Sequence, residues 1–258
     1  HAFYYVILVL LVAATYAALR IKGTRVGRAF EAIRENEIAA AAMGIDVPRY
    51  KVIAFVLASA YAGLAGDVQA LAERLRTKRS LVFCFCRAGM STVIHYLACL
   101  RAGHAVALLD AALHPAAKLE LIERYQPELL LSTGNRGETT MDDRGRGSHP
   151  EPHPALAVLL STSGTTGSPK LVRLSAGNIL HNAESIRAAL AIAPDDCAMG
   201  SLPFHYSYGL SVLNSHLRAG ASLALSRDGM LSSGFWEVCR EAECTSMAGV
   251  PYSYQLLR

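Results

Sequence analysis

The sequence predicts an α/β protein with two parts, an N-terminal transmembrane helical segment followed by a mostly parallel α/β domain. Residues Ala2 to Leu19 form an almost unbroken apolar run. From residue 67 onward, short apolar stretches alternate with helical patterns, as in a parallel sheet covered by helices. Hydrophobic residues make up 52% of the 258 residues and charged residues 18%, which excludes global disorder.

The first apolar run is long enough for a transmembrane helix. About 18 residues at 1.5 Å each cross most of a hydrocarbon core of roughly 30 Å. The basic residues Arg20, Lys22, Arg25 and Arg28 follow it, which indicates that the next loop stays in the cytoplasm. A signal peptide is disfavoured, because no basic flank precedes the run and no small-residue cleavage site follows it.

A second apolar run, Val52 to Gly66, is too short to cross a membrane. Its fifteen residues make roughly 22 Å of helix before Asp67 interrupts them. We therefore predict a seam near Gly66, with one part at residues 1–66 and another at residues 67–258. Genuine fusion, gene rearrangement and an assembly error all remain open as its origin.

The loop between the two apolar runs has a helical pattern from Gly27 to Ile45, followed by Val47-Pro48-Arg49-Tyr50-Lys51. By periodicity alone it is an ordinary charged amphipathic helix. The loop and its apolar flanks also resemble the inner-membrane permease of branched-chain amino acid ABC transporters. This resemblance implies an inner-membrane location, and an ABC ATPase subunit that docks on residues 28–45. The partner-binding residues that we expect there are Glu31, Ala32 and Gly44.

Charge and cysteine spacing exclude two other classes. The net charge is +4, with seven basic and four acidic residues up to position 66 and eighteen and seventeen after it, unlike a nucleic-acid-binding protein. Cys84 and Cys86 lie in a strand-like run and Cys99 on a helical pattern, while Cys239 and Cys244 lack zinc-site spacing. We expect reduced, structural thiols.

The elements of the α/β domain follow from periodicity, and several of its helices end in glycine. The expected strands are Leu81 to Cys86, Ala105 to Leu109, Glu128 to Ser132, Leu156 to Ser161, Ser222 to Ser226 and Thr245 to Ala248. The expected helices are Val68 to Lys78, Ser91 to Ala102, Ala116 to Tyr125, Asn178 to Leu190, Tyr208 to Arg218 and Gly234 to Glu241. Asn135 to Pro154 is predicted to be a mobile surface loop. Ligands of such folds bind at the carboxyl ends of the strands.

The segment Ser161 to Lys170 carries the strongest chemical signal. It leaves the buried run Leu156 to Leu160 and reads Ser-Thr-Ser-Gly-Thr-Thr-Gly-Ser-Pro-Lys. Glycines allow close approach of the backbone, amides and hydroxyls donate to anions, and the lysine adds a positive charge. The spacing does not match a Walker loop. A flexible linker is the other alternative, but the segment directly follows a strand, which favours phosphate binding.

This loop resembles the signature loop of adenylate-forming enzymes, which include acyl-CoA synthetases, luciferases and peptide-synthetase adenylation domains. Three further segments agree, so that the likeness spans nearly all of residues 67–258. They are Tyr96 to Gly103, Leu202 to Leu210, and Gly249-Val250-Pro251 with the following Tyr254 to Leu257. Leu171 departs from the glycine that commonly follows the lysine, which affects the choice of subfamily.

The resemblance implies ATP-dependent activation of a carboxylic acid to an acyl-adenylate, with Mg²⁺ present and with CoA or a carrier-protein thiol as a later acceptor. His205 would lie at the acid, as the catalytic residue. Those that would hold the phosphates of ATP are Thr162, Ser163, Gly164, Thr165, Thr166, Gly167 and Lys170. Because the adenine-binding and C-terminal segments of the family have no match before Arg258, we expect little or no activity from the chain.

The two resemblances make opposite demands on location. A completed second span would carry the ligase-like part to the outer face of the membrane, whereas an ATP-using enzyme needs the cytoplasm. The alternative function is therefore a permease component of a branched-chain amino acid transporter with an incidental ligase-like tail.

Overall fold

The computed structural model describes residues 63–75, 78–87, 89–134, 138–145, 151–161, 170–226 and 228–257. The chain divides into two compact units, His1–Leu64 with Ala193–Asp195, and Ala65–Ile192 with Asp196–Arg258. The second unit holds both sheets. The expected membrane span Ala2 to Leu19 and the expected docking residues Glu31, Ala32 and Gly44 lie outside the described residues.

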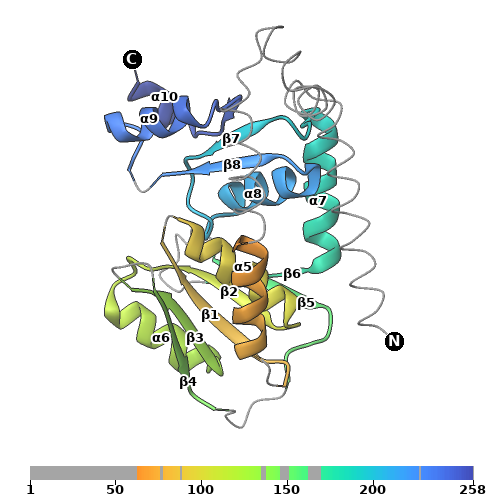
Figure 1. Ribbon diagram of the computed structural model, residues 1–258. Coiled ribbons are helices and arrows are strands. Elements are labelled where there is room, and N and C mark those ends of the chain that lie inside the picture. The colour runs from red at the N-terminus through yellow and green to blue at the C-terminus, as the bar shows by residue number, and fades with distance from the viewer. Residues whose placement is uncertain are drawn as a thin grey trace, which may run out of the picture. The chain divides into compact units, whose positions relative to one another are not determined.

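A six-stranded sheet with the order β4-β3-β1-β2-β5-β6 forms the larger layer (Figure 1). Its four central strands run parallel, and the two edge strands are antiparallel to their neighbours. The strands are β1 (Leu81–Cys86), β2 (Ala105–Asp110), β3 (Leu129–Thr133), β4 (Thr139–Asp143), β5 (Leu156–Ser161) and β6 (Leu171–Ser175). The mostly parallel α/β architecture predicted from the sequence is thereby confirmed.

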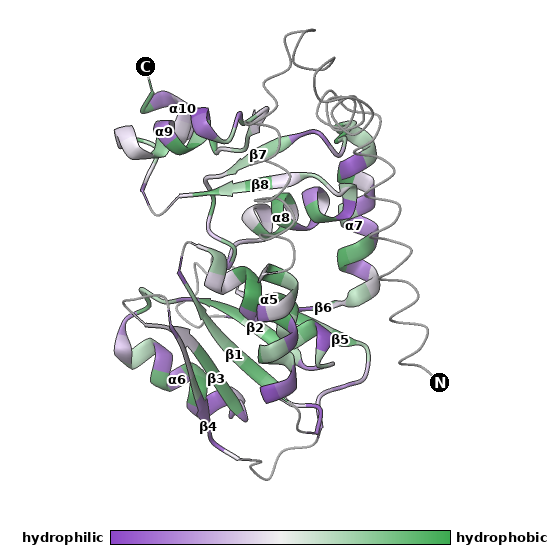
Figure 2. Cartoon of the chain, viewed as in Figure 1, coloured by the Kyte–Doolittle hydropathy of each residue, from purple (hydrophilic) through white to green (hydrophobic). Residues whose placement is uncertain are grey.

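Strands β1 and β2 are apolar along nearly their whole length, as Figure 2 shows, because helices cover both faces of the sheet. Phe83, Ala107 and Leu159 lie level with one another and belong to a core that α6 (Pro115–Tyr125) completes with Leu121. Neighbouring residues on each strand face the other way. On that side, the Cys84 thiol approaches His95 of α5 (Met90–Arg101).

The helical residues 63–74 come just before β1. Val68, Leu71, Ala72 and Leu75 are buried at the spacing of one helix face. The buried ring of His104 ties this segment to the sheet, because its Nε2 lies 2.7 Å from the Leu75 carbonyl and its Nδ1 accepts from the Ser80 amide. This buried face begins directly after the predicted seam.

A second, three-stranded parallel sheet has the order β8-β7-β9. Helix α8 contacts β7 and β8 and packs along α7, and its Asn214 accepts a hydrogen bond from Tyr96 of α5. The elements are α7 (Ala176–Ala189), β7 (Cys197–Gly200), α8 (Ser207–Ala219), β8 (Ser222–Leu225), α9 (Ser233–Glu241), β9 (Ser246–Met247) and α10 (Pro251–Gln255).

Three expectations need correction. The strands form two sheets rather than one. The stretch predicted as a loop, Asn135 to Pro154, contains β4, which pairs with β3 and is fastened to α5 by a 2.8 Å hydrogen bond between Thr139 and His95. Strands β6 and β7 and helix α10 were not predicted. No helix in the part of the chain that the structure describes is long and apolar enough to cross a membrane.

Three of the cysteines lie on the strand and the helix expected from the sequence. Cys84 and Cys86 are buried in β1, and Cys99 is buried in α5. Burial raises the pKa of the Cys99 thiol to about 12, which keeps it protonated and unreactive. Cys239 and Cys244 are also free thiols.

Candidate functional site

The predicted phosphate loop connects the paired strands β5 and β6. It lies at the carboxyl edge of the larger sheet, by which we mean the end of the sheet where its parallel strands have their carboxyl ends. Ser161 ends β5 and lies opposite Leu171, the first residue of β6. The six loop residues expected to hold phosphates fall within 162–169, outside the described residues. Lys170 is described, and it is exposed immediately before β6. The two ends of the loop are therefore fixed in the sheet side by side.

The predicted catalytic residue His205 lies at this same carboxyl edge. Its Nε2 is 3.9 Å from Oδ2 of Asp110, the last residue of β2, and β2 runs parallel to β5 as its immediate neighbour. The other carboxylate oxygen of Asp110 accepts a 2.8 Å hydrogen bond from the Ala112 amide, which holds the carboxylate in place. The structure thus brings His205 and the anchors of the loop to one edge of the sheet.

The imidazole of His205 is only 7% exposed, and its ring stacks at a tilt on Tyr206, with 4.4 Å between the ring centroids. Burial lowers the pKa of His205, and the nearby Asp110 carboxylate partly opposes this by favouring the charged ring. The ring is therefore neutral at pH 7. It can offer one N–H donor and one lone pair to a bound acid, but not a full positive charge.

The turn that presents His205 depends on Gly209. A Cβ at Gly209 would collide with the carbonyl oxygen of Pro203 and lie 2.8 Å from that of Leu202. The backbone of the turn and the first turn of α8 are therefore in direct contact. Phe204, which is buried beside His205, anchors the same turn. Tyr206 and Tyr208 are exposed instead.

Asp110 is the site residue that sequence reasoning missed. The available signal was its position as the first polar residue after the apolar run Ala105 to Leu109, at the carboxyl end of a predicted parallel strand. That signal alone does not reveal its partner, because the contact with His205 joins residues far apart in the sequence.

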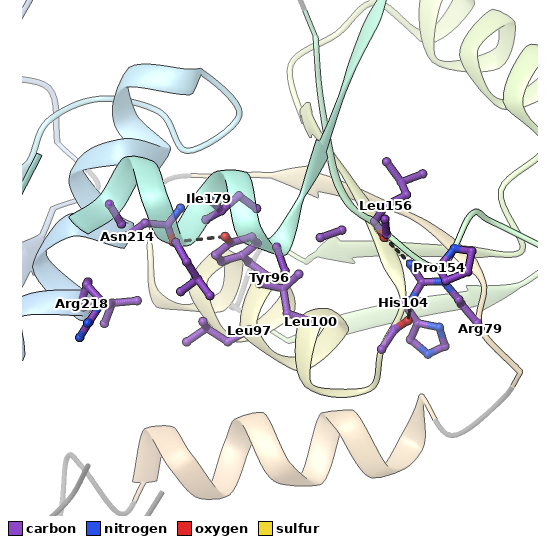
Figure 3. Close-up of a pocket in the computed structure, with 17 residues that line it drawn as sticks. Arg79, Tyr96, Leu97, Leu100, His104, Pro154, Leu156, Ile179, Asn214 and Arg218 are labelled. Carbon is purple, nitrogen blue, oxygen red and sulfur yellow. Dashed lines mark hydrogen bonds between the residues drawn. The ribbon is translucent and has the colours of Figure 1, made fainter. Parts of the chain in front are cut away.

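Figure 3 shows a cavity of about 500 Å³ at the other end of β5, near Leu156. The two arginines that line it already have partners within the protein. The Arg79 guanidinium donates to the carbonyls of Leu156, Gly103 and His153, and Arg218 pairs with Glu184 at 3.0 Å. The lining is otherwise mainly apolar. Because ligands of parallel α/β folds bind at the carboxyl ends of strands, this cavity is not the candidate site.

Two family models match the chain. The model described as AMP-binding enzyme matches residues 52–258, and the model described as the permease component of the branched-chain amino acid transport system matches residues 1–93. Both resemblances inferred from the sequence are confirmed. The two matches overlap over residues 52–93, on both sides of the predicted seam.

The individual relatives likewise include permease proteins and CoA ligases. The permease protein LivM of Escherichia coli is 31% identical over 155 residues, which are 60% of this chain and 36% of LivM. The sulfoacetate–CoA ligase of Cupriavidus necator is 34% identical over 104 residues, which are 40% of this chain and 20% of the ligase. The chain thus spans about a third or less of the length of these curated relatives.

Among solved structures, the o-succinylbenzoate CoA synthetase MenE of Bacillus subtilis, in complex with ATP and magnesium ion, is similar with a TM-score of 0.64 and 22% identity. The match covers 77% of this chain and 59% of that enzyme. Another structure of the same enzyme holds its acyl-adenylate intermediate. At this identity the likeness establishes the fold, that of the N-terminal part of adenylate-forming enzymes.

Proposed function

The chain belongs to the AMP-binding enzyme family, and we propose that its residues 67–258 bind ATP and a carboxylic acid for the formation of an acyl-adenylate. The observation that supports this most is the meeting of two predicted site elements at one edge of the sheet. The anchors of the loop lie at the end of β5, and His205 lies beside Asp110 at the end of the adjacent β2.

The residues at the loop suit a polyphosphate. Neither β5 nor β6 carries an acidic residue, so the loop leaves and re-enters the sheet without a nearby negative charge from those strands. Lys170 adds an exposed ammonium group at the point of re-entry. We propose that Thr162, Ser163, Gly164, Thr165, Thr166, Gly167 and Lys170 hold the β- and γ-phosphates. Bound ATP with Mg²⁺ would supply the α-phosphorus that the acid's carboxylate attacks, with pyrophosphate leaving.

His205 would orient the acid. Because its buried ring is neutral at pH 7, it carries a single N–H, which would donate to the acid's carboxylate. The Asp110 carboxylate, 3.9 Å from Nε2, lies too far away to accept that N–H in a hydrogen bond. The stack on Tyr206 restricts the ring. We propose that His205 positions the acid, with the thiol of CoA or of a carrier protein as the later acyl acceptor.

Lys170→Ala tests the proposal. We expect the full-length variant to bind ATP·Mg²⁺ about tenfold or more weakly than the unaltered chain in equilibrium dialysis, because it loses charge-assisted contacts with phosphate oxygens. Lys78→Ala is the matched control. Lys78 is exposed just before β1, at the amino ends of the parallel strands, so this variant should bind ATP normally. Equal ATP affinities for both variants and the unaltered chain would contradict the proposed role of the loop.

A second function is supported by the permease match over residues 1–93. We propose that residues 1–66 derive from an inner-membrane permease whose segment 28–45, with Glu31, Ala32 and Gly44, docks on an ABC ATPase, and that the ligase-like part requires the cytoplasm. Retention of a purified branched-chain amino acid transporter ATPase by the full chain, lost in Glu31→Lys and kept in Lys170→Ala, would favour this function. No retention would argue against it.

A further inference from the structure

A second cavity, of about 490 Å³, lies against the carboxyl half of β5, the strand β6 and the helices α7 and α8. It adjoins both parts of the candidate site. Leu160, which lines it, directly precedes Ser161 at the start of the loop, and Ser207 is two residues beyond His205. Its volume is that of a pocket for a small molecule.

The described lining of this cavity carries one charged side chain, and that charge is positive. Of the described residues that line it, Arg173 of β6 is the one that is ionised, and none is an aspartate or glutamate. The Arg173 side chain makes no ion pair with any residue that the structure describes. Within the described residues its guanidinium therefore keeps its donors for a ligand, unlike Arg79 and Arg218 in the other cavity, which are held by protein groups.

The amide side chains that line the cavity are left with donors rather than acceptors. The Oδ1 of Asn178 accepts a 3.0 Å hydrogen bond from the Ser175 amide, and the Oδ1 of Asn214 accepts one of 3.2 Å from the Tyr96 hydroxyl. The acceptor of each amide is thus in use, and its NH₂ group makes no hydrogen bond to the residues that the structure describes. Asn182 adds a third amide, with no hydrogen bond to the described residues.

The first turn of α8 adds further donors. Ser207 and Leu210 of this turn line the cavity, and so does Ser211, whose hydroxyl donates to the Tyr208 carbonyl. The N-cap residue, Tyr206, makes no side-chain capping hydrogen bond, so the first amides of the helix are not satisfied by a cap. The positive end of the helix dipole favours an anion at this position. A guanidinium, three amides and a helix N-terminus together suit a negatively charged ligand group.

We infer that this cavity binds a second anionic group of the activated acid, so that the substrate class is a short dicarboxylic acid. The inference rests on the proposed ligase function, which requires one carboxylate at the loop and His205. A second carboxylate would then enter the adjoining cavity and accept hydrogen bonds from Arg173 and the amides. A simple fatty acid would leave the exposed Arg173 and these amides to water, whereas a second carboxylate would form a charge-assisted pair with the guanidinium.

Calorimetric titration of the full chain with succinate and with butyrate tests this, because the two acids have the same number of carbon atoms and differ in the second carboxylate. We expect succinate to bind about tenfold or more tightly than butyrate. Arg173→Gln should weaken succinate binding about tenfold or more, and Asn182→Asp should do the same by placing a like charge in the cavity. Arg240→Gln removes one exposed positive charge from α9, outside the cavity, and should bind succinate normally.

Equal affinities for the two acids, or unaltered succinate binding by a folded Arg173→Gln variant, would overturn the inference. A titration with pyrophosphate separates the acid from the nucleotide as the source of the anion. If Arg173→Gln weakens pyrophosphate binding and leaves succinate binding unaltered, the cavity serves nucleotide phosphates and the inference fails. If succinate binds as expected but ATP does not bind, the anion-binding cavity is supported and the ligase function is contradicted.

Discussion

At the scale of single residues, Gly209 is constrained by the turn that carries His205. We expect Gly209→Ala to lower the free energy of unfolding by about 1–3 kcal/mol, because its new Cβ would press on two backbone carbonyls that cannot rotate away. Gly177→Ala in α7 is the matched control. Its Cβ would meet only the Ser175 hydroxyl at 3.6 Å, so its stability should be equal or slightly higher. Urea unfolding measures the free energy of unfolding of both variants. A Gly209→Ala variant as stable as the unaltered chain would contradict this constraint.

The charge state of His205 is a second prediction at this scale. Its pKa should lie below the ordinary value of about 6.5, because burial disfavours the charged ring. Asp110→Asn should lower this pKa further by removing the opposing carboxylate. NMR titration of labelled histidine measures it, with Asp142→Asn on the edge strand β4 as the control. A rise of the pKa in Asp110→Asn would contradict the placement of these two groups.

The same shift predicts how stability depends on pH. A histidine whose pKa is depressed on folding binds fewer protons in the folded state than in the unfolded state. Its contribution to stability is therefore complete above about pH 6.5 and is lost as the pH falls toward its folded pKa.

At the scale of elements, a capping box fixes the N-terminus of α7. The Ser175 hydroxyl accepts from the Asn178 amide at 3.1 Å, and the Asn178 side chain accepts from the Ser175 amide. Ser175→Ala should therefore cost about 1 kcal/mol of unfolding free energy, whereas Ser175→Asp, which keeps an acceptor, should cost little. Thermal unfolding of both variants checks this. Equal melting temperatures for the two would show that the cap does not stabilise the helix.

The periodicity of apolar residues along the sequence predicted most helices and strands well. The strands β1 and β5 begin and end as predicted, because long apolar runs bounded by polar residues define buried central strands. The strand β4 was missed because it is an exposed edge strand with Asp142 and Asp143, which lacks an apolar signal. The division into two sheets was also missed, since strand partners are chosen by contacts between distant segments.

At the scale of the whole molecule, the sequence identified the family of each part, because its loop and helix motifs are short and contiguous. The pairing of His205 with Asp110 and the donor-rich cavity at Arg173 could not be predicted in the same way. Both depend on side chains that only the folded chain brings together. The sequence therefore predicted the fold and the loop better than it predicted the surroundings of the bound acid.

The central claim is that the connection between β5 and β6 holds the phosphates of a nucleotide. Hydrogen–deuterium exchange of the full chain, with and without ATP·Mg²⁺, tests it most directly because it reports on the amides of that connection. We expect ATP to slow exchange in the peptide that contains residues 161–170, and to leave the peptide of α9 unaltered. Unchanged exchange at 161–170 with saturating ATP, or protection only elsewhere, would contradict the claim.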